Sequence, residues 1–242
     1  MQKMGNKIQR AEELQRKFHA LFQEWQQNTG LSIEEKTFSP DGIVNPEVWL
    51  DDTNRTKILF VLKETNRWCD ICEYVVRKRS SGKPPKWQTW NNIIRWTYLL
   101  RHWQDQTLDE MWEKVKFIDE SKRIYNLSRV ALININKQPG GKSTDTNRLK
   151  TAFELNNREF LSREIALCGH LDYIICCGKG VASCVCKCLG DIKFRKSKES
   201  PYRFAKTDEG TFILDFVHPQ SRKRKKELFE SLYNVLTSNS RD

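Results

Sequence analysis

The most informative absence from this 242-residue chain is that of long apolar segments. No hydrophobic run approaches the roughly 20 residues that a membrane-spanning helix needs. Residues 1–24 are polar and charged, and they contain no stretch that resembles the hydrophobic core of a secretory signal peptide. We therefore expect a cytoplasmic protein with no membrane partner.

Acidic residues are in short supply relative to basic ones. The chain has 31 Asp and Glu against 42 Lys and Arg, which gives a net charge of +11 and a sequence pI near 9.3. Such an excess of positive charge favours a polyanionic partner, most often nucleic acid. The eight cysteines of a protein expected in the cytoplasm predict reduced thiols rather than a disulfide framework.

The sequence also lacks internal repeats and a convincing linker. Apolar runs typical of buried strands alternate instead with segments whose apolar residues recur at helical spacing. We expect strands at about 57–62, 129–135 and 172–177, and a hairpin-like pair at 202–206 and 211–216. We expect helices at about 4–28, 90–103, 148–168, 178–189 and 221–237, and another that begins at Thr107 with the capping box Thr107-x-x-Glu110.

This alternation predicts one α/β domain over residues 1–242. Residues 1–56 would form an N-terminal helix and an ordered lead-in, and residues 57–237 would form the core. Polar residues whose side chains can take part in catalysis or binding follow or end three of the strands: Glu64, Asn134 and His218. Because ligands of open α/β sheets bind beyond the carboxyl ends of the strands, we expect this acid, amide and imidazole to converge on one site.

Four segments, taken in order, resemble the motifs of one known family. Residues 58–66 resemble a strand followed by a water-activating loop, and residues 134–140 resemble a segment that carries a base-reading Asn. Residues 173–182 resemble the strand–Gly–helix unit that follows, and His-Pro-Gln-Ser at 218–221 resembles a His-Pro-Ser loop. Over about 57–237 the chain thus resembles the uracil-DNA glycosylase superfamily. The resemblance implies a three-layer α/β/α sandwich around a short, mainly parallel central sheet.

The chain departs from the family in the first motif. Lys63, Thr65 and Asn66 stand where the family usually has Gly and Pro, and Glu64 stands where many members have Asp or Asn. These changes would reshape the floor of the base pocket and leave room for a larger modified base. Gln138 occupies the position at which the iron–sulfur branch has Cys, so we do not expect a cluster.

The resemblance implies a monofunctional DNA glycosylase, a hydrolase that reaches its target by base flipping. It would remove uracil or a modified pyrimidine from DNA by cleaving the N-glycosidic bond, leaving an abasic site. Uracil would indicate DNA repair, and a hypermodified phage cytosine would indicate phage defence. We expect DNA as the partner, with no cofactor, no metal and no obligate protein partner. The alternative is a non-catalytic nucleic-acid-binding protein on the same fold.

The family roles can be carried over to individual residues. Glu64 would orient water or stabilise the cationic sugar, Asn134 (or Asn136 in its place) would read the base, and His218 would stabilise the departing base. Further base contacts are expected from Lys63, Asn66, Trp68 and Trp87, of which the tryptophans would stack on the base. Each candidate also has a structural interpretation: a solvated acid, an Asn that ends a strand, or a His in a turn.

Phosphate contacts are expected from basic residues near these loops. Arg222 and Arg224 belong to a basic run after His218, at the start of an expected helix whose N–H groups also favour anions. The other expected phosphate-binding residues are Arg79, Lys137, Lys142 and Ser221.

Two weaker motifs stay open. Cys69 and Cys72 would make one half of a zinc site, although a structural site usually needs four ligands. Residues 141–144, Gly-Lys-Ser-Thr, resemble the end of a phosphate-binding P-loop, but Asn136 stands where that motif needs its first glycine.

Overall fold

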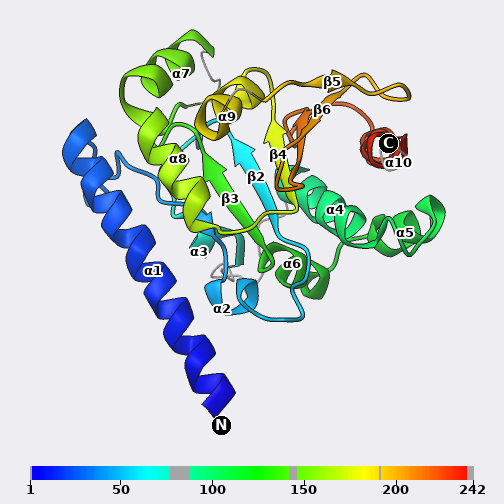
Figure 1. Ribbon diagram of the computed structural model, residues 1–242, viewed down its shortest axis with the longest axis horizontal. Helices are drawn as coiled ribbons and strands as arrows, with labels where there is room; N and C mark the ends of the chain where they lie inside the picture. The colour runs from blue at the N-terminus through cyan, green and yellow to red at the C-terminus, as the bar shows by residue number, and fades with distance from the viewer. Residues whose placement is uncertain (1, 77–87, 142–145, 191, 239–242) are drawn as a thin grey trace.

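The computed structural model describes residues 2–76, 88–141, 146–190 and 192–238. Its centre is a seven-stranded sheet within these residues, with strand order β1-β3-β2-β4-β7-β6-β5 (Figure 1). The strands are β1 (Gly42–Ile43), β2 (Ile58–Leu62), β3 (Val130–Asn134), β4 (Tyr173–Cys177), β5 (Arg195–Lys196), β6 (Arg203–Lys206) and β7 (Phe212–Phe216).

The sheet is mixed, and the expectation of a mainly parallel sheet was wrong in this respect. The four inner strands β3, β2, β4 and β7 are parallel, whereas β1 runs antiparallel to β3, and β6 runs antiparallel to both β7 and β5. The β6–β7 connection explains part of the difference. A short turn closed by hydrogen bonds from the Thr207 and Gly210 N–H groups can join only antiparallel neighbours.

Helices cover both faces of the sheet. One face is packed against α3 (Ile71–Val76), α4 (Gln88–His102), α5 (Leu108–Val115), α6 (Glu120–Leu127) and α10 (Lys225–Ser238). The other is packed against α1 (Gln2–Thr29), α2 (Pro46–Trp49), α7 (Thr146–Ala152), α8 (Arg158–Leu167) and α9 (Val181–Leu189). Phe60 and Leu62 of β2 enter the first core and Leu59 and Val61 enter the second, because successive side chains of a strand point to opposite faces. The fold is therefore α/β, with two cores separated by one sheet.

Helix α1 runs along the outside of the molecule beside α8 (Figure 1). Its buried residues include Phe18, Leu21, Phe22 and Trp25, whose spacing of three and four places them on one stripe. The spacing of these residues in the sequence predicted this helix and its buried face. None of the helices within the described residues combines the length and the apolarity that crossing a membrane requires.

The main strands and helices lie close to where the sequence placed them, and the differences are local. The capping box is confirmed, since Thr107 Oγ1 accepts the Glu110 N–H and the Glu110 carboxylate accepts the Thr107 N–H. Helices α2, α3 and α6, which have four, six and eight residues, were missed. The C-terminal helix begins at Lys225 rather than at 221, because residues 218–221 form a turn closed by the Ser221 N–H and the His218 carbonyl.

The expected helix at 148–168 is interrupted by a π-helical turn, η1 (Phe153–Asn157). Asn157 at the end of this turn is buried, where its Oδ1 accepts a hydrogen bond from Trp25 Nε1 at 3.1 Å. Its Nδ2 donates to the Ile135 carbonyl at 3.2 Å, just beyond β3. The irregular turn therefore joins α1 to the end of the strand that carries Asn134.

Candidate functional site

The loops after β2 and β3 are joined by hydrogen bonds that continue beyond the sheet. The Asn136 N–H donates to the Lys63 carbonyl at 2.9 Å, and the Gly140 N–H donates to the Thr65 carbonyl at 2.8 Å. Glu64 lies between these two connections. The two neighbouring strand ends thus form one ordered rim, as the convergence argument from the sequence anticipated.

The Glu64 carboxylate is held on both sides. Its Oε2 accepts a hydrogen bond from Asn136 Nδ2 at 3.0 Å. A Cβ atom at Gly140 would lie 1.7 Å from Glu64 Oε1, so any other residue at this position would force the carboxylate to move. Asn136 is therefore engaged with Glu64 through its Nδ2. The orienting roles of Asn136 and Gly140 were not foreseen, because nothing local in the sequence links them to residue 64.

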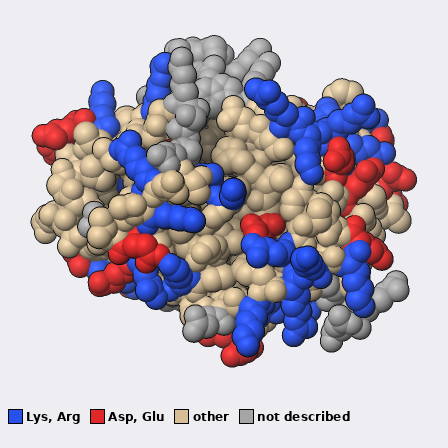
Figure 2. Space-filling view, turned by 90° about the horizontal axis from the view of Figure 1, so that it is seen from above, with Lys and Arg blue, Asp and Glu red and all other residues tan. Residues whose placement is uncertain are grey.

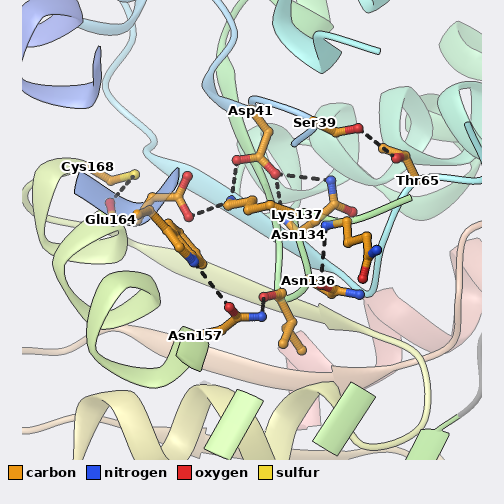
Figure 3. Close-up of polar contacts among 12 residues, drawn as sticks. Ser39, Asp41, Thr65, Asn134, Asn136, Lys137, Asn157, Glu164 and Cys168 are labelled. Carbon is orange, nitrogen blue, oxygen red and sulfur yellow. Dashed lines mark hydrogen bonds and ion pairs between the residues drawn. The ribbon is translucent and has the colours of Figure 1, made fainter. Parts of the chain in front are cut away.

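Asn134 is buried at the end of β3, next to the carboxylate of Asp41 (Figure 3). The backbone N–H of Asn134 donates to Asp41 Oδ2 at 2.7 Å, and its Nδ2 donates to the same oxygen at 3.0 Å. Among the described residues, the side-chain oxygen of Asn134 has no recorded hydrogen-bond partner. The amide is thus held from one side and is left with acceptor capacity on the other.

His218 lies in a tight turn after β7. Its Nδ1 accepts the Gln220 N–H at 3.1 Å, which places the proton of the neutral imidazole on Nε2. Burial, and secondarily the charge of Lys63, lower the pKa of His218. Asn92 of α4 anchors the turn by donating from Nδ2 to the Pro219 carbonyl at 2.7 Å. The imidazole is therefore positioned to act as a neutral hydrogen-bond donor.

Glu64, Asn134 and His218 line one pocket of about 500 Å³, which we call the inner pocket. Its wall also contains the aromatic side chains of Trp68, Tyr74 and Trp90. A second pocket of about 690 Å³, the basic pocket, is lined among others by Lys63, Lys179, Lys196, Tyr202, Arg203 and Ser221. The two pockets share Glu64, Asn66, His218 and Gln220, so these four residues lie at their boundary.

Those expected base-binding residues that the structure describes line one or both of the two pockets. Asn66 is exposed and lines both pockets, whereas Lys63 lines the basic pocket. A Cβ at Gly178, where φ is +106°, would lie 3.4 Å from Lys63 Cε and 3.5 Å from His218 Cβ. Trp68 lines the inner pocket and is anchored by a hydrogen bond from Nε1 to the Phe38 carbonyl at 2.8 Å. Trp87 lies outside the described residues.

The expectation that Lys137 binds phosphate was wrong. Its side chain is fully buried between Asp41 and Glu164, which accept hydrogen bonds from Nζ at 2.5 and 2.7 Å (Figure 3). The ring of Trp25 lies over the same ammonium at 4.9 Å. We call Asp41, Lys137 and Glu164 the buried ionic cluster. A lysine enclosed by two carboxylates cannot reach DNA.

The charges of the buried ionic cluster depend on each other. Burial by itself would lower the pKa of Lys137, but the charges of Asp41 and Glu164 and their hydrogen bonds raise it above its usual value. Burial and the nearby charge of Asp41 raise the pKa of Glu164 well above its usual range. These directions favour a charged Lys137 and a protonated Glu164. Sequence analysis missed Asp41 and Glu164 because each looks like an ordinary surface acid.

The other expected phosphate-binding residues are accessible where the structure describes them. Ser221 lines the basic pocket, and Arg222 and Arg224 are exposed. Arg79 and Lys142 lie outside the described residues. Figure 2, which views the molecule from above the ends of the parallel strands, shows Lys and Arg side chains spread across this face and most acidic side chains toward its margins.

The two weaker motifs gain no support within the described part of the chain. No group of three or more His, Cys, Asp and Glu side chains there is arranged to hold a metal ion. Burial raises the pKa of Cys69 to about 11 and that of Cys72 well above its usual value, which keeps both thiols protonated. Most of the P-loop-like segment, residues 142–145, lies outside the described residues.

Comparisons with family models, curated proteins and solved structures found no significant match to the chain.

The environment of His218 yields a prediction that needs no substrate. Replacing Lys63 with methionine removes a positive charge beside the imidazole, so the pKa of His218 should rise toward its ordinary value of 6.5 but stay below it, because burial remains. NMR titration of the imidazole would measure this. Lys179→Met, which removes an exposed charge from the same pocket, is the matched control and should change the pKa less. A His218 that titrates at or above 6.5 in the unmodified protein would contradict the prediction.

The same depressed pKa fixes the sign of a stability effect. The unfolded chain takes up a proton at this histidine at a higher pH than the native protein does. The neutral imidazole therefore contributes stability above the unfolded-state pKa, and this contribution is lost as the pH falls through the native value.

Proposed function

We propose that this protein is a DNA glycosylase that extrudes a uracil or modified pyrimidine nucleotide and hydrolyses its N-glycosidic bond, leaving an abasic site. The observation that carries the proposal is the convergence of Glu64, Asn134 and His218, from three separate strand ends, in the inner pocket. The volume of about 500 Å³ is in the range of small-molecule sites. The resemblance of the motifs to the uracil-DNA glycosylase superfamily adds to this argument.

The three side chains match the charges that develop in the reaction. As the bond between the sugar C1′ and the base nitrogen breaks, the sugar becomes positive and the base negative. The Glu64 carboxylate would stabilise the sugar and orient the water whose oxygen bonds to C1′. The Nε2–H of His218 would donate a hydrogen bond to a base oxygen as negative charge grows there. The water proton passes to the carboxylate or solvent, and the departing base is protonated at nitrogen.

The wall of the inner pocket suits a flat heterocycle. Trp68, Tyr74 and Trp90 supply aromatic surface on which a base could stack. Trp90 is 6% exposed, and its Nε1–H has no hydrogen-bond partner among the described residues. That nitrogen is itself buried, so Trp90 would offer a base ring surface and not a hydrogen bond.

The basic pocket supports nucleic acid as the carrier of the base. Lys63, Lys179, Lys196 and Arg203 line it, next to the boundary residues of the inner pocket. Of these, Arg203 is bonded to Asp215. Extruding a base costs stacking and pairing energy, which a grip on flanking phosphates helps to offset. A hypermodified cytosine stays a candidate substrate alongside uracil.

A direct test is a mass-spectrometric screen for free base. The protein is incubated with single- and double-stranded DNAs that carry uracil, deaminated purines or hypermodified cytosines. We expect one of these DNAs to release its base and acquire abasic sites without strand cleavage. Binding to the DNAs without base release from any of them would overturn the enzyme assignment and favour the non-catalytic nucleic-acid-binding protein.

A further inference from the structure

The buried ionic cluster lies behind the inner pocket, and Asp41 contacts Asn134 in the pocket wall. Asn134 lines that pocket, whereas Asp41, Lys137 and Glu164 do not. One carboxylate oxygen of Asp41 faces Lys137, and the other accepts both the backbone N–H and the Nδ2 of Asn134 (Figure 3). Asp41 thus connects a buried charge to the amide that the proposed function assigns to base reading.

This contact distinguishes the two ends of the Asn134 amide. Asp41 Oδ2 accepts the backbone N–H of Asn134, so this oxygen acts as an acceptor and must face Nδ2 and not Oδ1. Turning the amide by 180° would place Oδ1 against Asp41 Oδ2, with two acceptors in contact inside the protein. The backbone N–H of Asn134 holds that oxygen in place at 2.7 Å and prevents the carboxylate from moving aside. The amide therefore has one orientation.

We infer that Asp41 is a positioning residue that determines base specificity, because it fixes which end of the Asn134 amide faces each part of the inner pocket. This inference rests on the proposed function. Beyond the Nδ2–H donated to Asp41, the amide can offer a pocket-bound base its oxygen and its second N–H, in a fixed order.

A fixed order discriminates between two classes of pyrimidine. A 4-keto pyrimidine such as uracil presents a donor at N3 and an acceptor at O4. A 4-amino pyrimidine, such as cytosine or a cytosine modified at C5, presents an acceptor at N3 and a donor at N4. For a base seated in the same way, the fixed amide pairs with one of these two orders, and only the turned amide pairs with the other. By fixing the amide, Asp41 would therefore make the enzyme prefer either 4-keto or 4-amino pyrimidines.

Replacing Asp41 with serine should release the amide without destroying the fold. A hydroxyl group both donates and accepts, so it can face either end of the Asn134 amide. Lys137 keeps Glu164 as a partner at 2.7 Å. The pKa of Glu164 is raised in part by the charge of Asp41, so the loss of that charge favours ionised Glu164 beside Lys137. The buried charge thus stays balanced in the variant.

Glu164→Gln is the matched control. It changes the other side of the same lysine and replaces a protonated acid with a neutral amide of similar shape. Glu164 also forms a side-chain hydrogen bond with Asp41, which the glutamine amide can keep. The hydrogen bonds that Asp41 Oδ2 accepts from Asn134 do not involve residue 164. A merely structural role of the cluster predicts that the two variants behave alike, whereas the orienting role predicts that only Asp41→Ser changes the base preference.

The experiment measures base release from paired DNAs that differ only in a 4-keto or a 4-amino pyrimidine. We expect the preference ratio of the unmodified protein to fall by about tenfold or more in Asp41→Ser and to stay unchanged in Glu164→Gln. Equal losses on both DNAs in Asp41→Ser, with the ratio preserved, would overturn the inference.

A second measurement follows the side-chain amide protons of Asn134 by NMR, with the signal assigned by its loss in Asn134→Asp. In the unmodified protein and in Glu164→Gln one proton should exchange slowly with solvent, and in Asp41→Ser this protection should be lost. Equal exchange in all three proteins would refute the fixed orientation. If no DNA releases a base, the proposed function fails, and the NMR result alone decides whether Asp41 orients Asn134.

Discussion

Glu64→Gln should lower the rate of base release by about 10²–10⁴-fold while DNA binding persists. The substitution keeps the size of the side chain but removes its negative charge, which the proposed mechanism uses to stabilise the sugar cation and to orient water. The glutamine can still contact Asn136, which donates to Oε2 at 3.0 Å in the native site. Single-turnover base release, with DNA affinity measured in parallel, separates loss of chemistry from loss of binding.

Two further variants make this result specific. Glu35→Gln alters an exposed glutamate in the turn after α1 and should leave the rate unchanged. Gly140→Ala leaves Glu64 chemically intact but places a methyl group where the carboxylate oxygen lies, 1.7 Å from the ideal Cβ position, so it should also slow base release. Rates within about twofold of the unmodified protein for Glu64→Gln would remove the carboxylate from the mechanism.

The sequence could predict part of this site because its polar residues stand at the carboxyl ends of buried strands. Glu64, Asn134 and His218 follow or end strands whose residues are almost all buried, and parallel neighbours bring such ends to one edge. The alternation of strand side chains also predicts that successive residues of β2 enter opposite cores, as they do. Strand pairing therefore turns a local pattern into a spatial one without any detailed knowledge of side-chain contacts.

The partners of these residues were beyond sequence reasoning for a physical reason. Asp41, Asn92 and Gly140 act through contacts with residues far away or in other loops, and no periodicity marks them. Lys137 lies within the segment 134–140 that resembles a base-reading motif, so it was expected to contact phosphate, yet Glu164 of α8 and Asp41 enclose it. A buried charge depends on partners that only the folded chain brings together.

The same argument applies to the mixed sheet. The strands at 202–206 and 211–216 were recognised as a hairpin, which already implied one antiparallel pair. The other antiparallel pairs involve the two-residue strands β1 and β5. Segments so short show no recognisable alternation of apolar and polar residues in the sequence. Short edge strands are thus the part of this sheet that depends most on tertiary contacts.

Lys137→Met should lower the free energy of unfolding by about 3–5 kcal/mol, the range observed when one partner of a buried ion pair is removed. The methionine fills much of the volume but leaves the Asp41 carboxylate without its cationic partner, in a place where its side chain is fully buried. The remaining hydrogen bonds from Asn134 do not neutralise that charge. Urea denaturation followed by circular dichroism would measure the loss.

The matched control is Lys17→Met on α1. Lys17 is also ion-paired, with Glu13 at 2.7 Å, but both side chains are more than half exposed, so its replacement should cost at most about 1 kcal/mol. The difference between the two lysines isolates the effect of burial, because the substitution is identical. A loss at Lys137 as small as that at Lys17 would mean that the ammonium is not enclosed by Asp41 and Glu164 in solution. The placement of Asp41 behind Asn134 would then lose its electrostatic basis.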